Sequence, residues 1–199
     1  MSRRPKQFCD SVAAVLLLTC VAVAAPADSS RDATARLPAP WTPTPLSVPK
    51  GYVVEVAAAP PLVKHPLMAD FDSQGRLYVA ASCGENLPRE ELEKRLPNYV
   101  QQLVDTDGDG QFDRATRFAD QMTFPQGCLW HEGSLYVASS GAIWKLTDAD
   151  DDGVAEQRAK IVGDFGYTGN GADVDGPFRG PDGRMYWCEG RHGHRIEIP

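Results

Sequence analysis

Two nine-residue stretches of the sequence share one pattern, D-x-D-x-D-G-x-x-[D/E], and this repetition constrains the fold more than any other feature. The first runs from Asp105 to Asp113, and the second from Asp148 to Glu156. Acids at positions 1, 3 and 5 of a curling loop converge on one point, and the glycine at position 6 permits the sharp turn. Such a cage of oxygen atoms suits calcium.

The pattern resembles the calcium loops that join strands in integrin-type β-propellers. That resemblance implies four acidic side chains and one backbone carbonyl, at position 7, as ligands in each loop. The expected ligands are Asp105, Asp107, Asp109, Gln111 and Asp113 in the first loop, and Asp148, Asp150, Asp152, Val154 and Glu156 in the second. An EF-hand is excluded because its position 12 needs a glutamate, and Thr116 and Ala159 stand there. The alternative is a pair of solvated Asp/Gly turns, and Asp151 is expected to be solvated in either case.

The N-terminus has the features of a secretory signal peptide. Three basic residues precede an apolar run over 12–25, which ends at small residues around Ala25. We therefore predict a signal peptide over 1–27 and an exported protein, periplasmic or extracellular, with no membrane span after cleavage. Cys20 is not expected to be a lipid anchor, because Thr19 is a poor match to the small residue that precedes a lipidated cysteine.

Charge and cysteine content exclude several classes of protein. Removing 1–27 takes away three basic residues and one acidic residue, which changes the formal charge from −7 to about −9, so no nucleic acid partner is expected.

Three cysteines remain, Cys83, Cys128 and Cys188. Cys83 and Cys128 either form one disulfide or stay free, and the absence of C-x-x-C excludes a thiolate zinc site and a c-type haem.

Residues 28–47 form an extended linker rich in proline and alanine. After it, a strand is expected over 52–56, and a turn-Gly-x-[Leu/Met]-Tyr strand begins at Gly75, Gly133 and Gly183. Repeats of about 50 residues with short strands between them are typical of propeller blades. Tyr78, Tyr136, Tyr186, Trp144 and Trp187 are expected in the blade core. The charged segment 88–99 is expected to be a short surface helix.

The sequence therefore predicts an all-β fold, a partial β-propeller of about three blades over 48–199, with each acidic loop joining two strands. At about 50 residues per blade, three blades are too few to close a ring, so the chain is expected to be truncated. An open edge would then invite pairing with another chain.

The region from 48 to 198 also resembles a bacterial family of putative membrane-bound dehydrogenases. The resemblance rests on Val48–Val56, on the hairpin at Gly75, on Pro125-Gln126-Gly127, and on Gly180–Trp187. Those proteins have a propeller similar to soluble glucose/sorbosone dehydrogenases, often followed by helical repeats and a cytochrome c domain. The resemblance implies oxidation of a sugar-like or polyol substrate with pyrroloquinoline quinone as cofactor or cytochrome c as electron acceptor.

In the sugar dehydrogenases a His-Gly pair before the Gly-Pro-Asp-Gly turn supplies the general base, and here the corresponding pair is Asp175-Gly176. A carboxylate could take this role if burial raised its pKa. Asp175 is thus the first candidate catalytic residue, and Arg191 and His192 are the others, because they lie in a cluster that could hold an anionic ligand. That cluster could equally be a polar turn. The alternatives to an enzyme are a noncatalytic glycan- or protein-binding propeller and a nonfunctional gene remnant.

Overall fold

The computed structural model describes residues 32–33 and 46–195. The signal peptide expected over 1–27 lies outside these residues, as do most of the linker and the last four residues of the chain. The described chain consists of antiparallel β-sheets and one helix, α1 (Arg89–Arg95), so the all-β prediction is confirmed. This helix is too short and too polar to cross a membrane.

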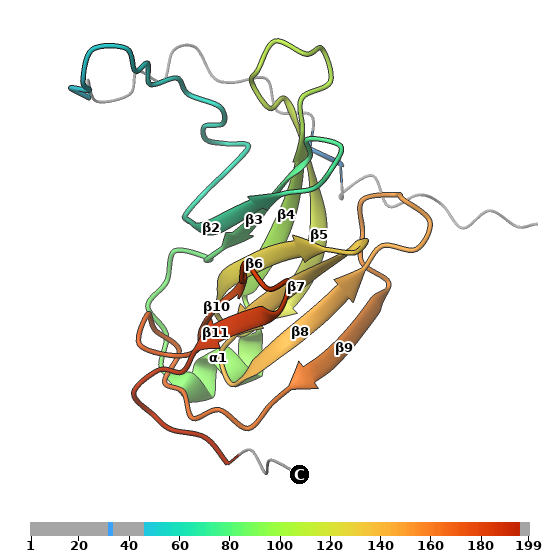
Figure 1. Ribbon diagram of the computed structural model, residues 1–199. Coiled ribbons are helices and arrows are strands. Elements are labelled where there is room, and N and C mark those ends of the chain that lie inside the picture. Colours follow the sequence, from blue (N-terminus) through green and yellow to red (C-terminus); the bar gives the residue numbers. More distant parts are fainter. Residues whose placement is uncertain (1–31, 34–45, 196–199) are drawn as a thin grey trace, which may run out of the picture.

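The first sheet has the strand order β1-β5-β4-β3-β2. Its strands are β1 (Asp32–Ala33), β2 (Pro66–Phe71), β3 (Leu77–Ala81), β4 (Asn98–Val104) and β5 (Arg114–Met122). The β2–β3 hairpin turns at Gly75, whose φ of +83° is a conformation that favours glycine. The helix α1 lies in the connection between β3 and β4, as the charged segment predicts (Figure 1).

The second sheet is an antiparallel meander with the order β6-β7-β8-β9. Its strands are β6 (Pro125–His131), β7 (Ser134–Ser139), β8 (Ala142–Thr147) and β9 (Gln157–Val162). A third sheet holds β10 (Asp175–Arg179) and β11 (Met185–Cys188). No sheet in the described part of the chain closes on itself.

Edge strands of the three sheets lie next to one another. β6 packs against both β2 and β10. The Trp130 backbone N–H donates to Asp70 Oδ2 on β2 at 2.7 Å, and the Gln126 side chain donates to the Val174 carbonyl at 2.8 Å. β6 and β10 approach so closely at Gly127 that an added Cβ would lie 1.7 Å from the Gly176 carbonyl oxygen. The three sheets thus meet along the edge strands β2, β6 and β10.

The main hydrophobic core lies between the first and second sheets. It contains Tyr78 and Phe118 of the first sheet and Leu135, Val137 and Leu146 of the second. The Tyr78 ring stacks on Trp130 and meets Phe118 edge to face, at centroid distances of 4.9 Å and 4.8 Å. Burial of this kind, with geometry favourable to aromatic rings, is what holds two sheets together.

Two sequence predictions about the core and strands are wrong. Residues 52–56 form no strand, because no strand of the described chain pairs with them, and Tyr52 and Val53 are exposed. Tyr186 and Trp187 are also exposed, because only one other strand, β10, pairs with β11 in the described residues. Tyr78 is fully buried as predicted, whereas Tyr136 and Trp144 are half-buried. Cys83, Cys128 and Cys188 are all free thiols.

Candidate functional site

Each acidic loop joins two neighbouring antiparallel strands, as predicted. The first acidic loop (Asp105–Asp113) joins β4 to β5, and the second acidic loop (Asp148–Glu156) joins β8 to β9 (Figure 1). Strand pairing on both sides fixes the two ends of each loop close together, so nine residues must curl back within a short span. The glycines at position 6, Gly110 and Gly153, have φ of +90° and +89°. This is the conformation that the turn needs and that glycine adopts without strain.

The two loops share three internal hydrogen bonds. The position 6 amide donates to the position 1 carboxylate, at 2.9 Å for Gly110 to Asp105 and 2.8 Å for Gly153 to Asp148. The position 7 amide donates to the position 5 carboxylate at 2.8 Å in both loops. The position 2 amide donates to the position 9 carboxylate, at 3.2 Å and 3.0 Å. The repeated sequence therefore produces a repeated backbone.

The carboxylates converge in both loops but not to the same extent. In the second loop, four carboxylates offer oxygens within 4.8 Å of one another: Asp148, Asp150, Asp152 and Glu156. In the first loop, Asp105, Asp107 and Asp109 do so, without Asp113. Like charges this close repel each other by roughly 1 kcal/mol per pair even in water, and a divalent cation would relieve that repulsion.

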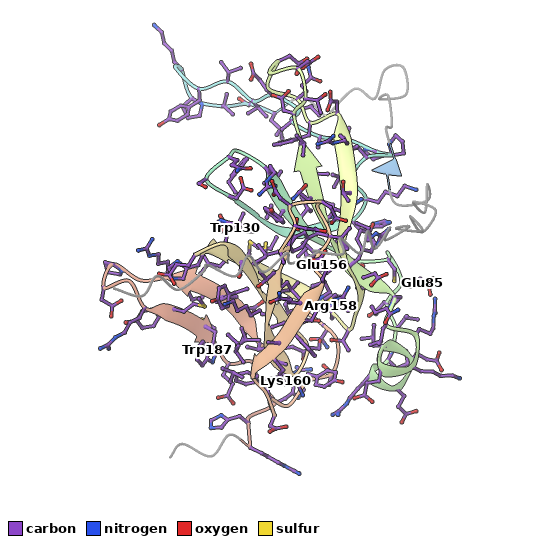
Figure 2. The ribbon with its side chains drawn as sticks, turned by 90° about the vertical axis from the view of Figure 1, so that its right-hand side faces the viewer. Glu85, Trp130, Glu156, Arg158, Lys160 and Trp187 are labelled. Atoms are coloured by element: carbon purple, nitrogen blue, oxygen red, sulfur yellow. The ribbon has the colours of Figure 1, made fainter. Side chains whose placement is uncertain are left out.

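The residue at position 2 explains why Glu156, at position 9 of the second loop, joins the acidic cluster, whereas Asp113 at position 9 of the first loop does not. In the first loop the Thr106 hydroxyl donates to Asp113 Oδ2 at 2.5 Å, while the Thr106 amide donates to Oδ1. Both oxygens of Asp113 thus have a partner. In the second loop position 2 is Ala149, which has no hydroxyl, so Glu156 receives one amide bond and its second oxygen is left for the cluster. Figure 2 shows Glu156 at the start of β9.

Hydrogen bonds from the loop backbone also change the pKa of Asp105. The amides of Gly110 and Gly108 donate to Asp105 and lower its pKa below the usual value for aspartate. Asp105 therefore stays ionised into acid solution, as a metal ligand must.

The second loop lies between the first two sheets. The amide of Ala155, at position 8, donates to the Phe118 carbonyl of β5 at 2.8 Å, and the Ala155 side chain belongs to the main core. The buried Gly153 faces Gln102 and Thr116 of the first sheet. Asp151, expected to be solvated, is exposed, but it forms an ion pair with Arg76 at 2.5 Å. This loop therefore connects the two sheets.

The first loop packs instead on the segment before β2. The amide of Phe112, also at position 8, donates to the Ala57 carbonyl at 2.8 Å. Its ring is buried in a small second core with Leu62 and Val63. Sequence reasoning missed the role of position 8, although both loops carry an apolar residue there.

Arg191 and His192 lie next to one residue that sequence reasoning missed, Asp173, and the charge of Asp173 also acts on Asp175. The side chain of Asp173 is 1% exposed and accepts hydrogen bonds from three backbone amides and one hydroxyl. The donors are the amides of Thr168, Gly169 and Asn170 and the hydroxyl of Ser140. A buried carboxylate with this many donors is fully satisfied, so it fixes the glycine-rich loop 164–171. An aspartate three residues after Asn170 in a Gly/Asn-rich stretch is the sequence signal for such a turn.

Arg191 and His192 lie beside Asp173. His192 Nε2 is 4.0 Å from Asp173 Oδ1 and 3.2 Å from the Thr168 hydroxyl. The Arg191 guanidinium donates to His192 Nε2 at 3.3 Å, and its backbone amide donates to the Ala172 carbonyl. These two residues thus have structural partners within the polar turn.

Asp175 is half-buried at the start of β10. Burial, and then the charge of Asp173, raise the pKa of its carboxyl above the usual value for aspartate. This is the direction that a general base requires if it is to accept a proton near neutral pH. The structure therefore brings Arg191 and His192 together, and it places Asp175 within the electrostatic influence of the same buried aspartate.

Comparison with known proteins places the chain in a family but gives it no named relative. Residues 43–198 match DUF7133, which is described as a domain of unknown function. Neither the curated proteins nor the solved structures contain a significant match. Because the match covers most of the chain, including β2 to β11, the chain belongs to the DUF7133 family.

Proposed function

We propose that this protein is an exported, calcium-stabilised domain of the β-propeller type. The observation that carries the proposal is the convergence of the acids of the second loop, four of which offer oxygens within 4.8 Å. The first loop repeats the same pattern and the same internal hydrogen bonds. Aspartate and glutamate oxygens are the ligands that calcium prefers, and the glycine turn gives the curvature that such sites need.

The arrangement of the sheets supports a propeller. In propellers, sheets of about four strands radiate from a central axis, and each sheet begins with its innermost strand. Here β2, β6 and β10 are each an edge strand that begins a meander or hairpin, and β6 lies against both β2 and β10. Two of the sheets contain a four-stranded antiparallel meander, β2 to β5 and β6 to β9. The acidic loops join the outer strands, so calcium would stabilise the outer part of each sheet.

Thermal unfolding with and without calcium tests this proposal. Calcium at about 100 times its dissociation constant would add about 2.7 kcal/mol to the free energy of unfolding per site, so the melting temperature should rise by several degrees. The double variant Asp107→Ala/Asp150→Ala should lose that rise. The control Glu90→Ala/Glu91→Ala removes the same charge from the first turn of α1, and this variant should keep the calcium-induced rise. An unchanged calcium response in the loop variant would refute the site.

A second candidate function is oxidation of a sugar-like alcohol, with electrons passed to a cytochrome c, and the raised pKa of Asp175 favours it. In this role Asp175 would accept the hydroxyl proton of the substrate. Pyrroloquinoline quinone carries three carboxylates, whereas Arg191 is the cation hydrogen-bonded within this cluster. One guanidinium does not match three carboxylates, so the cluster by itself does not fit the quinone and we assign it no step.

The variant Asp175→Asn separates the catalytic role from a structural one. Because the pKa of Asp175 is raised in the folded protein, its ionisation opposes folding as the pH rises through the folded pKa. The asparagine variant should therefore be as stable as the parent, or slightly more stable, at neutral pH, and this gain should vanish below the unfolded pKa of about 3.9. If Asp175 is a base, the same variant should abolish reduction of an artificial electron acceptor with sugar alcohols. Full activity in the variant would exclude Asp175 as the base.

A further inference from the structure

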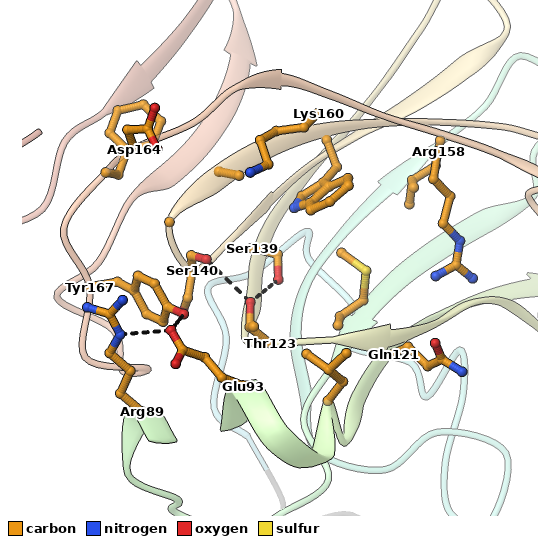
Figure 3. A pocket seen from close by; sticks show the side chains of 17 residues that line it. Arg89, Glu93, Gln121, Thr123, Ser139, Ser140, Arg158, Lys160, Asp164 and Tyr167 are labelled. Carbon is orange, nitrogen blue, oxygen red and sulfur yellow. Dashed lines mark hydrogen bonds and ion pairs between the residues drawn. The ribbon is translucent and has the colours of Figure 1, made fainter. Parts of the chain in front are cut away.

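A cavity of about 430 Å³ lies between α1, the second sheet and the loop 164–167, away from both acidic loops. Cavities of this size hold small ligands. Its apolar walls come from three segments of the chain: Met122 of β5, Trp144 and Leu146 of β8, and Phe165 of the loop. Its polar walls are Arg89 and Glu93 of α1, Arg158 and Lys160 of β9, and a group of hydroxyls (Figure 3).

Two glycines make room for side chains at this cavity. A Cβ at Gly141 would lie 2.9 Å from the Tyr167 ring, so the absence of a side chain there lets Tyr167 pack at the wall. A Cβ at Gly163 would lie 2.9 Å from Lys160 Cδ, so the Lys160 stem lies over Gly163. The ammonium of Lys160 is then 5.9 Å from the centre of the Trp144 ring. An aromatic face and a cation are therefore presented together.

Most polar groups of the cavity already have partners. Glu93 accepts from Arg89 at 2.9 Å and from the Tyr167 hydroxyl. Burial, and then the bond to Glu93, raise the pKa of Tyr167 to about 12, so this hydroxyl remains a donor to Glu93. Arg158 forms an ion pair with Asp120 at 3.0 Å. Figure 3 shows the Arg89–Glu93–Tyr167 group on one wall of the cavity.

The hydroxyl groups are also mutually satisfied. Thr123 Oγ1 and Ser139 Oγ are 2.9 Å apart, and the Phe124 amide donates to Ser139 Oγ. The Ser140 hydroxyl donates to Asp173. A polyhydroxylated sugar would therefore find few free hydrogen-bond partners on these walls. An apolar ring needs no such partners, so it would bind here without leaving polar groups unpaired.

Lys160 is the cation of the cavity whose side chain has no ion pair or hydrogen bond with any of residues 46–195. Arg158 and Lys160 lie two residues apart on the same face of β9 (Figure 2), but among residues 46–195 only Arg158 has an acidic partner. The cavity lining contains two acids. Glu93 is already paired with Arg89, and Asp164 is exposed and not within ion-pair distance of Lys160. An anionic group on a ligand would complete the pairing of the Lys160 ammonium.

We propose that this cavity binds a small carboxylate whose planar apolar ring stacks on Trp144 while its carboxylate pairs with Lys160. This site is separate from the acidic loops and from Asp175, and it does not depend on calcium. The aromatic and aliphatic walls would hold the ring, and Lys160 would set the charge of the ligand.

Isothermal titration of the full chain with three probes tests the proposal. Indole-3-acetate carries both the ring and the charge, indole-3-acetamide carries the ring alone, and glucuronate carries the charge on a hydroxylated ring. We expect indole-3-acetate to bind at least about tenfold more tightly than either of the others, the size of one charge-assisted hydrogen bond. No measurable heat at millimolar indole-3-acetate would overturn the site, and tighter binding of glucuronate would overturn the assignment of the ring.

Two lysine variants locate the binding. Lys160→Met should weaken indole-3-acetate by about tenfold and leave indole-3-acetamide unchanged. Lys145→Met is the matched control, because Lys145 Nζ also lies 5.9 Å from an aromatic ring, that of Tyr136, but does not line the cavity. Both lysines are on the protein surface or half-buried, so neither variant is expected to unfold the chain. Equal affinities in the two variants would overturn the role of Lys160.

Discussion

The two acidic loops have the same sequence pattern and the same internal hydrogen bonds, but they stabilise different parts of the molecule. In both loops the backbone amide of position 8 donates a hydrogen bond of 2.8 Å to a backbone carbonyl outside the loop. In the first loop it binds Ala57, ahead of β2, whereas in the second it binds Phe118 on the neighbouring sheet. The pattern thus determines the structure within each loop, and the surroundings determine what a bound ion would stabilise.

This difference gives the two loops different consequences for folding. The first loop holds the segment 57–63 against the first sheet through Phe112. The second loop holds the second sheet against the first, through Ala155, Gly153 and the Arg76–Asp151 pair. Damage to the first loop should therefore release a local segment, while damage to the second should weaken the interface between sheets.

The largest expected contrast comes from the glycines at position 6. Gly110→Ala and Gly153→Ala impose the same backbone strain, about 1–2 kcal/mol, because both have a left-handed φ. At Gly110 nothing lies within 4 Å of the new Cβ, but at Gly153 it would meet Gln102 at 3.0 Å and Thr116 at 3.3 Å. Overpacking there adds about 1–3 kcal/mol. Urea unfolding without calcium measures both losses, and equal losses would contradict a docked second loop.

A smaller contrast comes from the arginine that links the second loop to the β2–β3 hairpin. Arg76 donates to Asp72, whose side chain is fully buried, and to Asp151, whose side chain is 67% exposed. Arg76→Met should cost about 1–3 kcal/mol because Asp72 loses a charged donor, although it keeps the amides of Gln74 and Arg76. Asp151→Asn should cost less than about 1 kcal/mol, since this half of the pair is exposed.

Arg114 gives a matched control for the Arg76→Met change. It is an exposed arginine at the start of β5, next to the first loop, and has no ion pair among the residues that the structure describes. Arg114→Met should leave the free energy of unfolding unchanged. If Arg76→Met proved as harmless as Arg114→Met in urea unfolding, the link between the second loop and the first sheet would contribute nothing to stability.

Local sequence patterns predicted the features that depend on neighbouring residues. The hairpin turns, the helix α1 and the position of each acidic loop between two strands follow from short motifs with a definite conformational requirement, such as glycine at a left-handed φ. The strand expected over 52–56 failed because alternation of side chains does not supply a pairing partner. A strand needs a neighbour, and in this structure β2 lies against β6.

Contacts between distant residues could not be predicted from one sequence. Asp151 meets Arg76 across 75 positions of the chain, and Asp173 meets Ser140 across 33. Nothing in the residues around Asp151 indicates that its loop would lie on another sheet. The candidate site was therefore predictable to the extent that its ligands are adjacent in sequence, and the cluster around Asp173 was only partly predictable.

The smallest contrast concerns position 2, where Thr106 occupies both oxygens of Asp113 and Ala149 leaves one oxygen of Glu156 for the acidic cluster. If this hydroxyl limits the first loop, Thr106→Ala should tighten its calcium binding roughly threefold. Ala149→Thr should weaken the second loop by a similar factor. Both changes correspond to one net hydrogen bond of about 0.5–1 kcal/mol.

Calcium titrations resolve the two sites if each variant is made in a chain whose other loop is disabled, with Asp150→Ala for the first loop and Asp107→Ala for the second. Thr106→Ser keeps a hydroxyl and should retain the parent affinity, so it separates the hydrogen bond from the loss of side-chain volume. If Thr106→Ala and Thr106→Ser bind calcium equally, the hydroxyl is not what distinguishes the loops. The shorter side chain of Asp113 compared with Glu156 would then be the cause, and Asp113→Glu would be the change that makes the first loop resemble the second.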